Sequence, residues 1–174
     1  MLKLVLPSIE YKESFLEALD EFKKAQKEHI ENSLVKRYGE SANLDEFIKK
    51  LLGEAEGTFL PEGYVPHTVY WLVDGKKWLG WLDIRHRLNK HLEEVGGHIG
   101  YAIRPSERGK GYGNKILELA LPEAKKLGIA DVRITCNVDN IPSAKVIEKN
   151  GGVFENTAIA DDGVVRRRYW IHLT

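Results

Sequence analysis

The chain has 174 residues, of which 43% are hydrophobic and 30% are charged, a composition typical of soluble globular proteins. This length suits one domain with a hydrophobic core and is short for two, so we expect residues 1–174 to form a single domain. The 26 basic residues equal the 26 acidic ones. This balance argues against a nucleic-acid binder or a protein of membrane surfaces, which normally carry an excess of Lys and Arg.

Targeting and metal-binding signals are also missing from the sequence. No apolar run approaches the ~20 residues of a membrane span, and the N-terminus lacks the pattern of a signal peptide. The single cysteine, Cys136, permits no internal disulfide, and the histidines show no metal-binding spacing. We therefore expect a cytoplasmic protein without a metal site and without a membrane partner.

The first half of the chain is predicted to form a strand, two helices, a hairpin and another strand. Apolar residues recur at helical spacing in both helices, and Asp74-Gly75 is the turn signal of the hairpin. These elements occupy residues 2–6, 8–30, 43–52, 67–88 and 98–103, with loops at 53–66 and 89–97.

The second half is predicted to form a long helix, a strand, a short helix and two final strands. The long helix begins after Gly113 and ends before Gly128, a residue suited to a helix C-terminus. Asn140 can cap the short helix at 140–152. The strands are expected at 130–138, 153–160 and 164–173. Together these patterns predict one α/β domain of the mixed α+β kind.

Three glycines, Gly109, Gly111 and Gly113, alternate with basic or polar residues between Arg104 and Lys115. Glycine lets the backbone adopt positive φ and approach a ligand closely. The following helix would present its free N–H groups at the positive end of its dipole. The segment is therefore a candidate site for a phosphate group.

Two common phosphate loops do not match this segment. The Walker A pattern needs G-K-[ST] at its end, and residue 114, five positions after Gly109, is Asn114. The dinucleotide fingerprint needs a third glycine where Asn114 or Ile116 stands.

The pattern Arg108-x-x-Gly111-x-Gly113 does resemble the acyl-CoA pyrophosphate loop of the GNAT superfamily of N-acetyltransferases. The preceding "YAIRP" resembles the family's fourth strand, and "NVDNIPSAKVIEKNGG" resembles its later helix segment. The close resemblance runs from Gly97 to Gly152. It implies a central mixed, mostly antiparallel sheet of six to seven strands flanked by about four helices.

The resemblance also implies an activity, the transfer of an acetyl group from acetyl-CoA to a primary amine by direct attack on the thioester. Acetyl-CoA would be a co-substrate, the acceptor a small molecule or peptide, and a homodimer would fit the family. The implied cofactor-binding residues lie on the fourth strand, the glycine loop and the start of the later helix. They are Tyr101, Ala102, Ile103, Arg108, Gly109, Lys110, Gly111, Tyr112, Gly113, Asn114, Asn140 and Ser143.

The acceptor amine must lose a proton before it attacks, so the chemistry needs a base or a water chain. Candidates are Glu93, Glu94 and His98, which lie before or at the start of the cofactor strand. An unperturbed histidine pKa of ~6.5 suits a base. An ordinary strand histidine and solvated loop carboxylates are the competing interpretations. A main-chain N–H at about Ile103 would stabilise the oxyanion.

The departing thiolate also needs a proton, and here the sequence departs from the family pattern. The position of the family's usual tyrosine is occupied by Ile147. Tyr101, Tyr169 or water could supply the proton instead. The departure leaves open a second class of function, a non-catalytic module that binds acyl-CoA.

Overall fold

Seven strands form two antiparallel sheets in the computed structural model, which describes residues 1–25 and 33–174. The larger sheet has the order β1-β2-β3-β4, and the smaller has the order β5-β7-β6. The larger comprises β1 (Leu2–Val5), β2 (His67–Asp74), β3 (Lys77–Arg85) and β4 (Ile99–Ile103). The smaller comprises β5 (Asp131–Asn137), β6 (Val153–Ile159) and β7 (Val165–His172).

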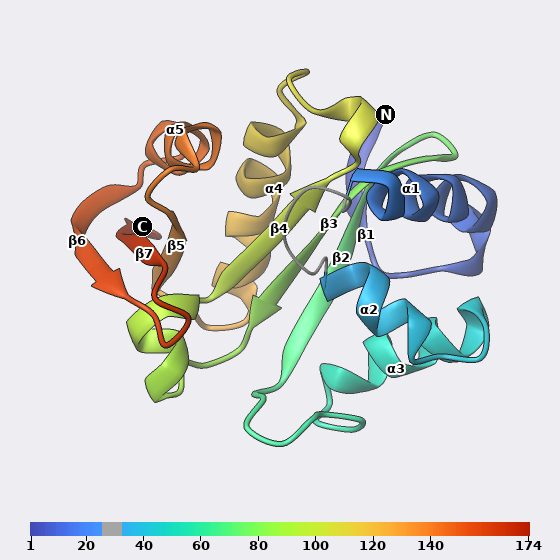
Figure 1. Ribbon diagram of the computed structural model, residues 1–174, viewed down its shortest axis with the longest axis horizontal. Helices are drawn as coiled ribbons and strands as arrows, with labels where there is room; N and C mark the ends of the chain where they lie inside the picture. The colour runs from blue at the N-terminus through green and yellow to red at the C-terminus, as the bar shows by residue number, and fades with distance from the viewer. Residues whose placement is uncertain (26–32) are drawn as a thin grey trace.

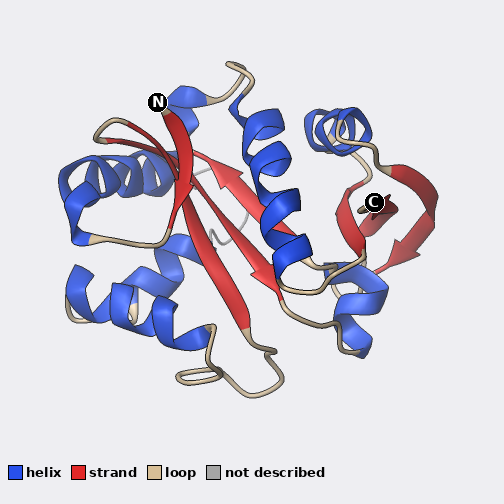
Figure 2. Ribbon diagram, turned by 180° about the vertical axis from the view of Figure 1, so that it is seen from behind, coloured by secondary structure: helices blue, strands red, loops and turns tan. Residues whose placement is uncertain are grey.

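Helices cover both faces of the larger sheet, as Figures 1 and 2 show. On one face lie α1 (Lys12–Ala25), α2 (Ser33–Gly39) and α3 (Leu44–Glu54); on the other lies α4 (Tyr112–Lys126). The last helix, α5 (Ile141–Lys149), lies with the smaller sheet at one end of the molecule. Short helical turns occupy Ile9–Tyr11, Leu92–Gly96 and Pro105–Glu107.

Most predicted elements are confirmed, and the fold class is the expected mixed α+β one. Three details differ. The seven strands are divided between two sheets instead of forming one, the expected loop at 89–97 contains the π-helical turn Leu92–Gly96, and α2 was not predicted. Seven residues are too few for α2 to show a clear helical period. Of the predicted helix at 8–30, residues 26–30 lie outside the described residues.

Two hydrophobic cores lie on opposite faces of the larger sheet. Between the sheet and α1–α3, Phe15 stacks on Trp71 at 4.9 Å between ring centroids and meets Trp78 edge-on. The other core joins the sheet to α4, α5 and the smaller sheet, and includes Ile147 and the buried thiol of Cys136. The first core therefore fixes α1–α3, and the second holds the two sheets together.

A β-bulge in β3 decides which way its tryptophans point. Leu72 pairs with Gly80 but Val73 pairs with Trp78, so Leu79 is an extra residue. Without the bulge, side chains three positions apart would point to opposite faces. With it, Trp78 and Trp81 both join the core beside α1–α3.

Candidate functional site

One edge of β4 pairs with no strand among residues 1–25 and 33–174. The chain touches β5 just ahead of β4, where the His98 N–H donates to the Arg133 carbonyl at 2.7 Å and Gly97 forms an isolated bridge with Ile134. Beyond that point the described strands β4 and β5 do not pair, and they end separate sheets. The result is a split between the sheets that starts at Gly97 and opens along β4.

The glycine at position 97 allows the two sheets to meet at the closed end of the split. Its φ is +71°, a value that favours glycine. A Cβ there would lie 2.6 Å from the Arg133 carbonyl oxygen, which is too close for any side chain.

The strand register shows which main-chain groups face the split. The N–H of Arg85 donates to the His98 carbonyl, and the N–H of Arg104 donates to the Leu79 carbonyl, both at 2.8 Å. Because hydrogen-bonded pairs alternate along an antiparallel ladder, Tyr101 and Ile103 direct their main-chain N–H and C=O groups away from β3. The N–H and C=O of Tyr101 and the N–H of Ile103 are available to an extended ligand that pairs with β4 as a further strand would, whereas the Ile103 C=O accepts a hydrogen bond from Arg108.

The glycine loop lies at the end of β4 and opens α4. Gly109 and Gly111 have φ values of +76° and +86°, and Gly111 is the N-cap of the helix. Six consecutive amide N–H groups make no hydrogen bond with another described residue; they belong to Gly109, Lys110, Gly111, Tyr112, Gly113 and Asn114. Such a run of free donors at a helix N-terminus suits a phosphate group.

Arg104, a cation just ahead of this loop, is buried against α1. Its Nε donates to Glu21 Oε1 at 2.8 Å, and Glu21 Oε2 accepts the Ser106 N–H at 3.0 Å. Glu17 forms a second ion pair with the same guanidinium. Arg104 therefore fastens the start of the loop to α1, and its charge is already balanced.

The two other cations of the loop also have partners within the protein. Arg108 Nε donates to the Ile103 carbonyl at 3.2 Å, and Lys110 Nζ donates to Glu107 at 3.0 Å. Glu107 is buried and also binds Lys77. The main-chain N–H groups are thus the most available donors of the loop.

Tyr101 reaches across the split to α5. Its Oη lies 3.1 Å from Ser143 Oγ, and the Ser143 N–H donates to the capping side chain of Asn140 at 3.1 Å. Burial raises the pKa of the Tyr101 hydroxyl, although the Ser143 hydrogen bond opposes this. The hydroxyl therefore stays protonated at neutral pH and can serve as a proton donor.

The other candidates for the acid are less well placed. Ile147 is fully buried, and Tyr169, also buried, donates its hydroxyl hydrogen to Glu148 at 3.1 Å. Of the two tyrosines proposed from sequence, Tyr101 is the one that borders the split.

The base candidates do not converge on the split. His98 is buried, and its Nδ1 accepts the Arg133 N–H at 2.9 Å, which is a structural role. Burial, together with the charges of Arg85 and Arg133, lowers the pKa of His98 to about 4. Glu93 and Glu94 are exposed on the π-helical turn.

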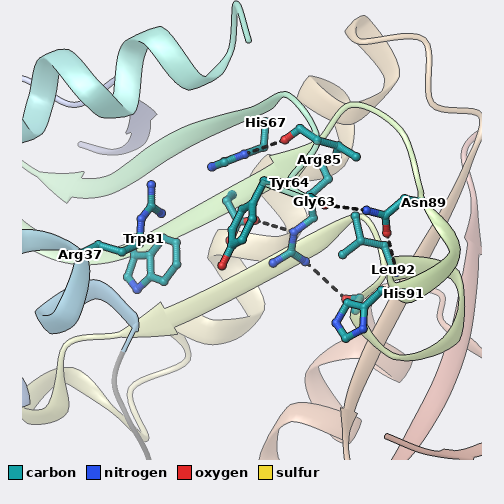
Figure 3. A pocket seen from close by; sticks show the side chains of 12 residues that line it. Arg37, Gly63, Tyr64, His67, Trp81, Arg85, Asn89, His91 and Leu92 are labelled. Atoms are coloured by element: carbon teal, nitrogen blue, oxygen red, sulfur yellow. Dashed lines mark hydrogen bonds and ion pairs between the residues drawn. The ribbon is translucent and has the colours of Figure 1, made fainter. Parts of the chain in front are cut away.

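A pocket that the sequence did not reveal lies on the α1–α3 side of the larger sheet (Figure 3). Its volume is about 280 Å³. Arg37 and Trp81 lie on one side, Asn89, His91 and Leu92 on the other, and Tyr64 between them. Gly63, Val65, His67, Asp83, Arg85 and Gly96 complete the lining.

Two ion-pair groups border this pocket. Asp83 Oδ2 forms an ion pair with Arg85 Nε at 2.8 Å, while Glu54 binds both Arg37 and His67. Burial by itself would lower the pKa of His67, but hydrogen bonding to Glu54 and nearby negative charge outweigh this and raise it. Asp83 and Arg85 lie on the face of β3 that is directed toward the pocket. Charged residues at such positions of a hairpin strand were the sequence signal that could have revealed this pocket.

Neither a membrane-spanning helix nor a metal cluster occurs in the described part of the chain. None of the helices in residues 1–25 and 33–174 is long and apolar enough to cross a membrane. In the same residues, no cluster of three or more His, Cys, Asp and Glu side chains is arranged to hold a metal ion.

Comparison with known proteins agrees with the fold and with the glycine loop beside β4. The family model of the acetyltransferase (GNAT) domain matches residues 17–153. No curated protein is detectably similar to the chain in sequence.

Solved structures of acetyltransferases share the fold at low sequence identity. RimL, a ribosomal L7/L12 alpha-N-protein acetyltransferase in complex with coenzyme A, has a TM-score of 0.69 and 18% identity, covering 99% of this chain and 94% of its own. The microcin C7 self-immunity acetyltransferase MccE, in complex with acetyl-CoA and AMP, has a TM-score of 0.68 and 18% identity, covering 99% and 92%. A spermidine N-acetyltransferase chimera from Vibrio cholerae and hSSAT has a TM-score of 0.66 and 13% identity, covering 98% and 95%.

Proposed function

The chain belongs to the family of GNAT acetyltransferases, and from this membership we propose that it transfers the acetyl group of acetyl-CoA to a primary amine. The observation that carries the proposal is the open edge of β4 with the glycine loop at its end. A ligand with a pyrophosphate joined to an extended amide chain fits both features at once.

Acetyl-CoA would be held by main-chain groups more than by side-chain charge. The free N–H groups of the glycine loop would bind the pyrophosphate, which is worth at most ~2 kcal/mol at a helix N-terminus. Micromolar affinity requires about 8 kcal/mol, so the loop alone is insufficient. The pantetheine arm would add hydrogen bonds to Tyr101 and Ile103 along the open edge of β4.

The transfer forms a C–N bond and breaks the C–S bond of the thioester. The nitrogen loses its proton to a water chain, and the sulfur of CoA gains one from Tyr101, which solvent then reprotonates. The Tyr101 N–H faces the split next to Gly100 and would stabilise the oxyanion, which leaves the Ile103 N–H expected for this role to the pantetheine arm. The Tyr101 hydroxyl, on the α4 side of the sheet, would protonate the thiolate. His98 is not proposed as the base, because its Nδ1 already accepts a main-chain hydrogen bond.

Calorimetric titration of the protein with acetyl-CoA tests this proposal, with ATP and NAD as control ligands. We expect micromolar binding of acetyl-CoA and much weaker binding of the two controls. Absence of acetyl-CoA binding by folded protein would overturn the assignment of the loop and of the activity together.

A second candidate function is favoured by one observation. The buried Ile147 leaves the usual position of the family's acid without a proton donor, as expected of a module that binds acyl-CoA without turnover. Tight binding of acetyl-CoA, combined with no amine-dependent release of free thiol across varied amines, would support it.

Tyr101→Phe should lower kcat by about 100-fold, the lower end of the range for general acid catalysis, because the CoA thiolate is a tolerable leaving group. Binding of acetyl-CoA should change little. The loss should shrink as the pH rises toward the thiol pKa of ~8.5, since protonation of the thiolate then matters less. Thiol release as a function of pH measures this effect.

Tyr70→Phe is the matched control, because it removes another half-buried hydroxyl on the same face of the sheet, outside the split. This control should retain full activity. Equal losses in the two variants would assign Tyr101 a packing role only.

A further inference from the structure

The pocket lies against β3, which pairs with the strand on which the thioester is proposed to rest. Trp81, Asp83 and Arg85 alternate along β3 and line the pocket, whereas Leu82 belongs to the core on the α4 side. Asp83 pairs with Gly100 of β4. Its Oδ1 lies 3.0 Å from the position that a Cβ at Gly100 would occupy. Because glycine has no side chain, the carboxylate lies against the bare backbone of β4, one residue from Tyr101.

The Asp83–Arg85 pair has one unused acceptor and one unused donor side by side. Asp83 Oδ2 binds Arg85 Nε at 2.8 Å, and Arg85 Nη1 donates to the carbonyls of Gly96 and Gly97 at 3.3 Å each. Among the described residues, none donates a hydrogen bond to Asp83 Oδ1 and none accepts a hydrogen bond from Arg85 Nη2. A ligand that presents a donor next to an acceptor would satisfy both atoms.

The charge around the pocket is already balanced. Asp83 is matched by Arg85, and Glu54 is matched by Arg37 and His67. The pocket therefore has no spare carboxylate to balance an ammonium group, which suits a single amine that is neutral when it attacks. Burying an unmatched charge is costly, so an acceptor with several positive charges fits poorly.

We infer that this pocket binds the acceptor and that its substrate class is the α-aminoacyl group, a primary amine with a carbonyl oxygen on the neighbouring carbon. The amine donates to Asp83 Oδ1, and the carbonyl oxygen accepts from Arg85 Nη2. Tyr64 and His91 at the rim are exposed, so a peptide chain beyond its first residue can extend into solvent. The inference rests on the proposed acetyl transfer.

The first test compares amines that differ only in the inferred feature. Thiol release from acetyl-CoA is measured with alaninamide, with isopropylamine, which lacks the carbonyl, and with spermidine. We expect kcat/KM for alaninamide to exceed that of both other amines by about 100-fold, because a site built to bind a polar group discriminates against ligands without it. A short peptide with a free N-terminus distinguishes the source: a higher kcat/KM than alaninamide indicates a polypeptide, and an equal or lower value indicates a small amino-acid derivative.

The second test changes the pocket. Asp83→Asn should raise KM for alaninamide and lower kcat/KM by about 100-fold, within the range for losing a charged hydrogen-bond partner, with acetyl-CoA affinity unchanged. Asp131→Asn, which removes an exposed carboxylate on β5, is the control and should behave as the unchanged protein does. The first comparison needs no variant, so it stands even if Asp83→Asn does not fold.

The outcomes separate this inference from the proposal on which it rests. If the unsubstituted protein does not bind acetyl-CoA, the proposed function is refuted. If the protein binds acetyl-CoA, three results would overturn the α-aminoacyl inference alone. They are a kcat/KM for spermidine or isopropylamine equal to that for alaninamide, no acetylation of any α-amine, and a KM for alaninamide that Asp83→Asn leaves unaltered.

Discussion

Substitution of Gly111 by glutamate is expected to weaken acetyl-CoA binding by about 100-fold, which corresponds to ~3 kcal/mol. Gly111 has a φ of +86°, and holding another residue in that conformation costs roughly 1–3 kcal/mol. The new carboxylate would also repel the pyrophosphate at the N-terminus of α4. Calorimetric titration with acetyl-CoA measures the effect.

Gly128→Glu provides a closely matched control. Gly128 follows the other end of α4 and has a φ of +83°, and at both glycines the position that a Cβ would occupy has no other atom within 4 Å. The two substitutions therefore carry similar backbone strain and add the same charge. We expect a similar loss of thermal stability in both variants and a loss of binding only at Gly111; equal affinities would mean that the loop does not bind the pyrophosphate.

Acidification from pH 6.5 to pH 4.5 should reduce the free energy of unfolding by about 2 kcal/mol through His98 alone, since up to 1.36 kcal/mol is lost for each pH unit between its two pKa values. The pKa of His98 falls from 6.5 in its ordinary state to about 4 in the folded protein, mainly because of burial. The unfolded chain thus binds the proton more readily than the folded one. The stabilisation is complete above pH 6.5 and is lost as the pH falls toward 4.

The pH window isolates this histidine from the carboxylates. Glu54 and Glu107 have folded pKa values below their ordinary 4.5, so their stabilisation is lost mainly below that pH. Urea denaturation at several pH values should show a steep slope that His98→Gln lowers, since glutamine can accept the Arg133 N–H without titrating; the smaller contribution of His86, whose pKa burial also lowers, would remain. His172→Gln, at an exposed histidine, is the control; an unchanged slope in His98→Gln would contradict the assignment.

The sequence by itself determined the local structure of this protein. Asn140 caps α5 through its side chain, Asp74-Gly75 begins the hairpin turn, and Gly111 opens α4. Each of these features depends on a few neighbouring residues, and the chemistry of those residues is visible in the sequence. The order of strands and helices and the glycine loop could be predicted for the same reason. The cofactor roles of the individual loop residues stay predictions.

Only the tertiary structure decided where the chemistry can take place. The contact between Tyr101 and Ser143 joins residues 42 positions apart, and the bond from Arg104 to Glu21 spans 83. No local pattern encodes such pairs, because the first depends on how the two sheets separate at Gly97 and the second on how α1 packs against the larger sheet.

The pocket shows the same limit of sequence reasoning. Asp83 lies against Gly100 only because β3 pairs with β4 in one register, and a shift of one residue would place its side chain on the opposite face. The bulge at Leu79 likewise places Trp81 on the same face as Trp78. Residue type and spacing determine the elements, whereas register and the division of the sheets determine which side chains meet.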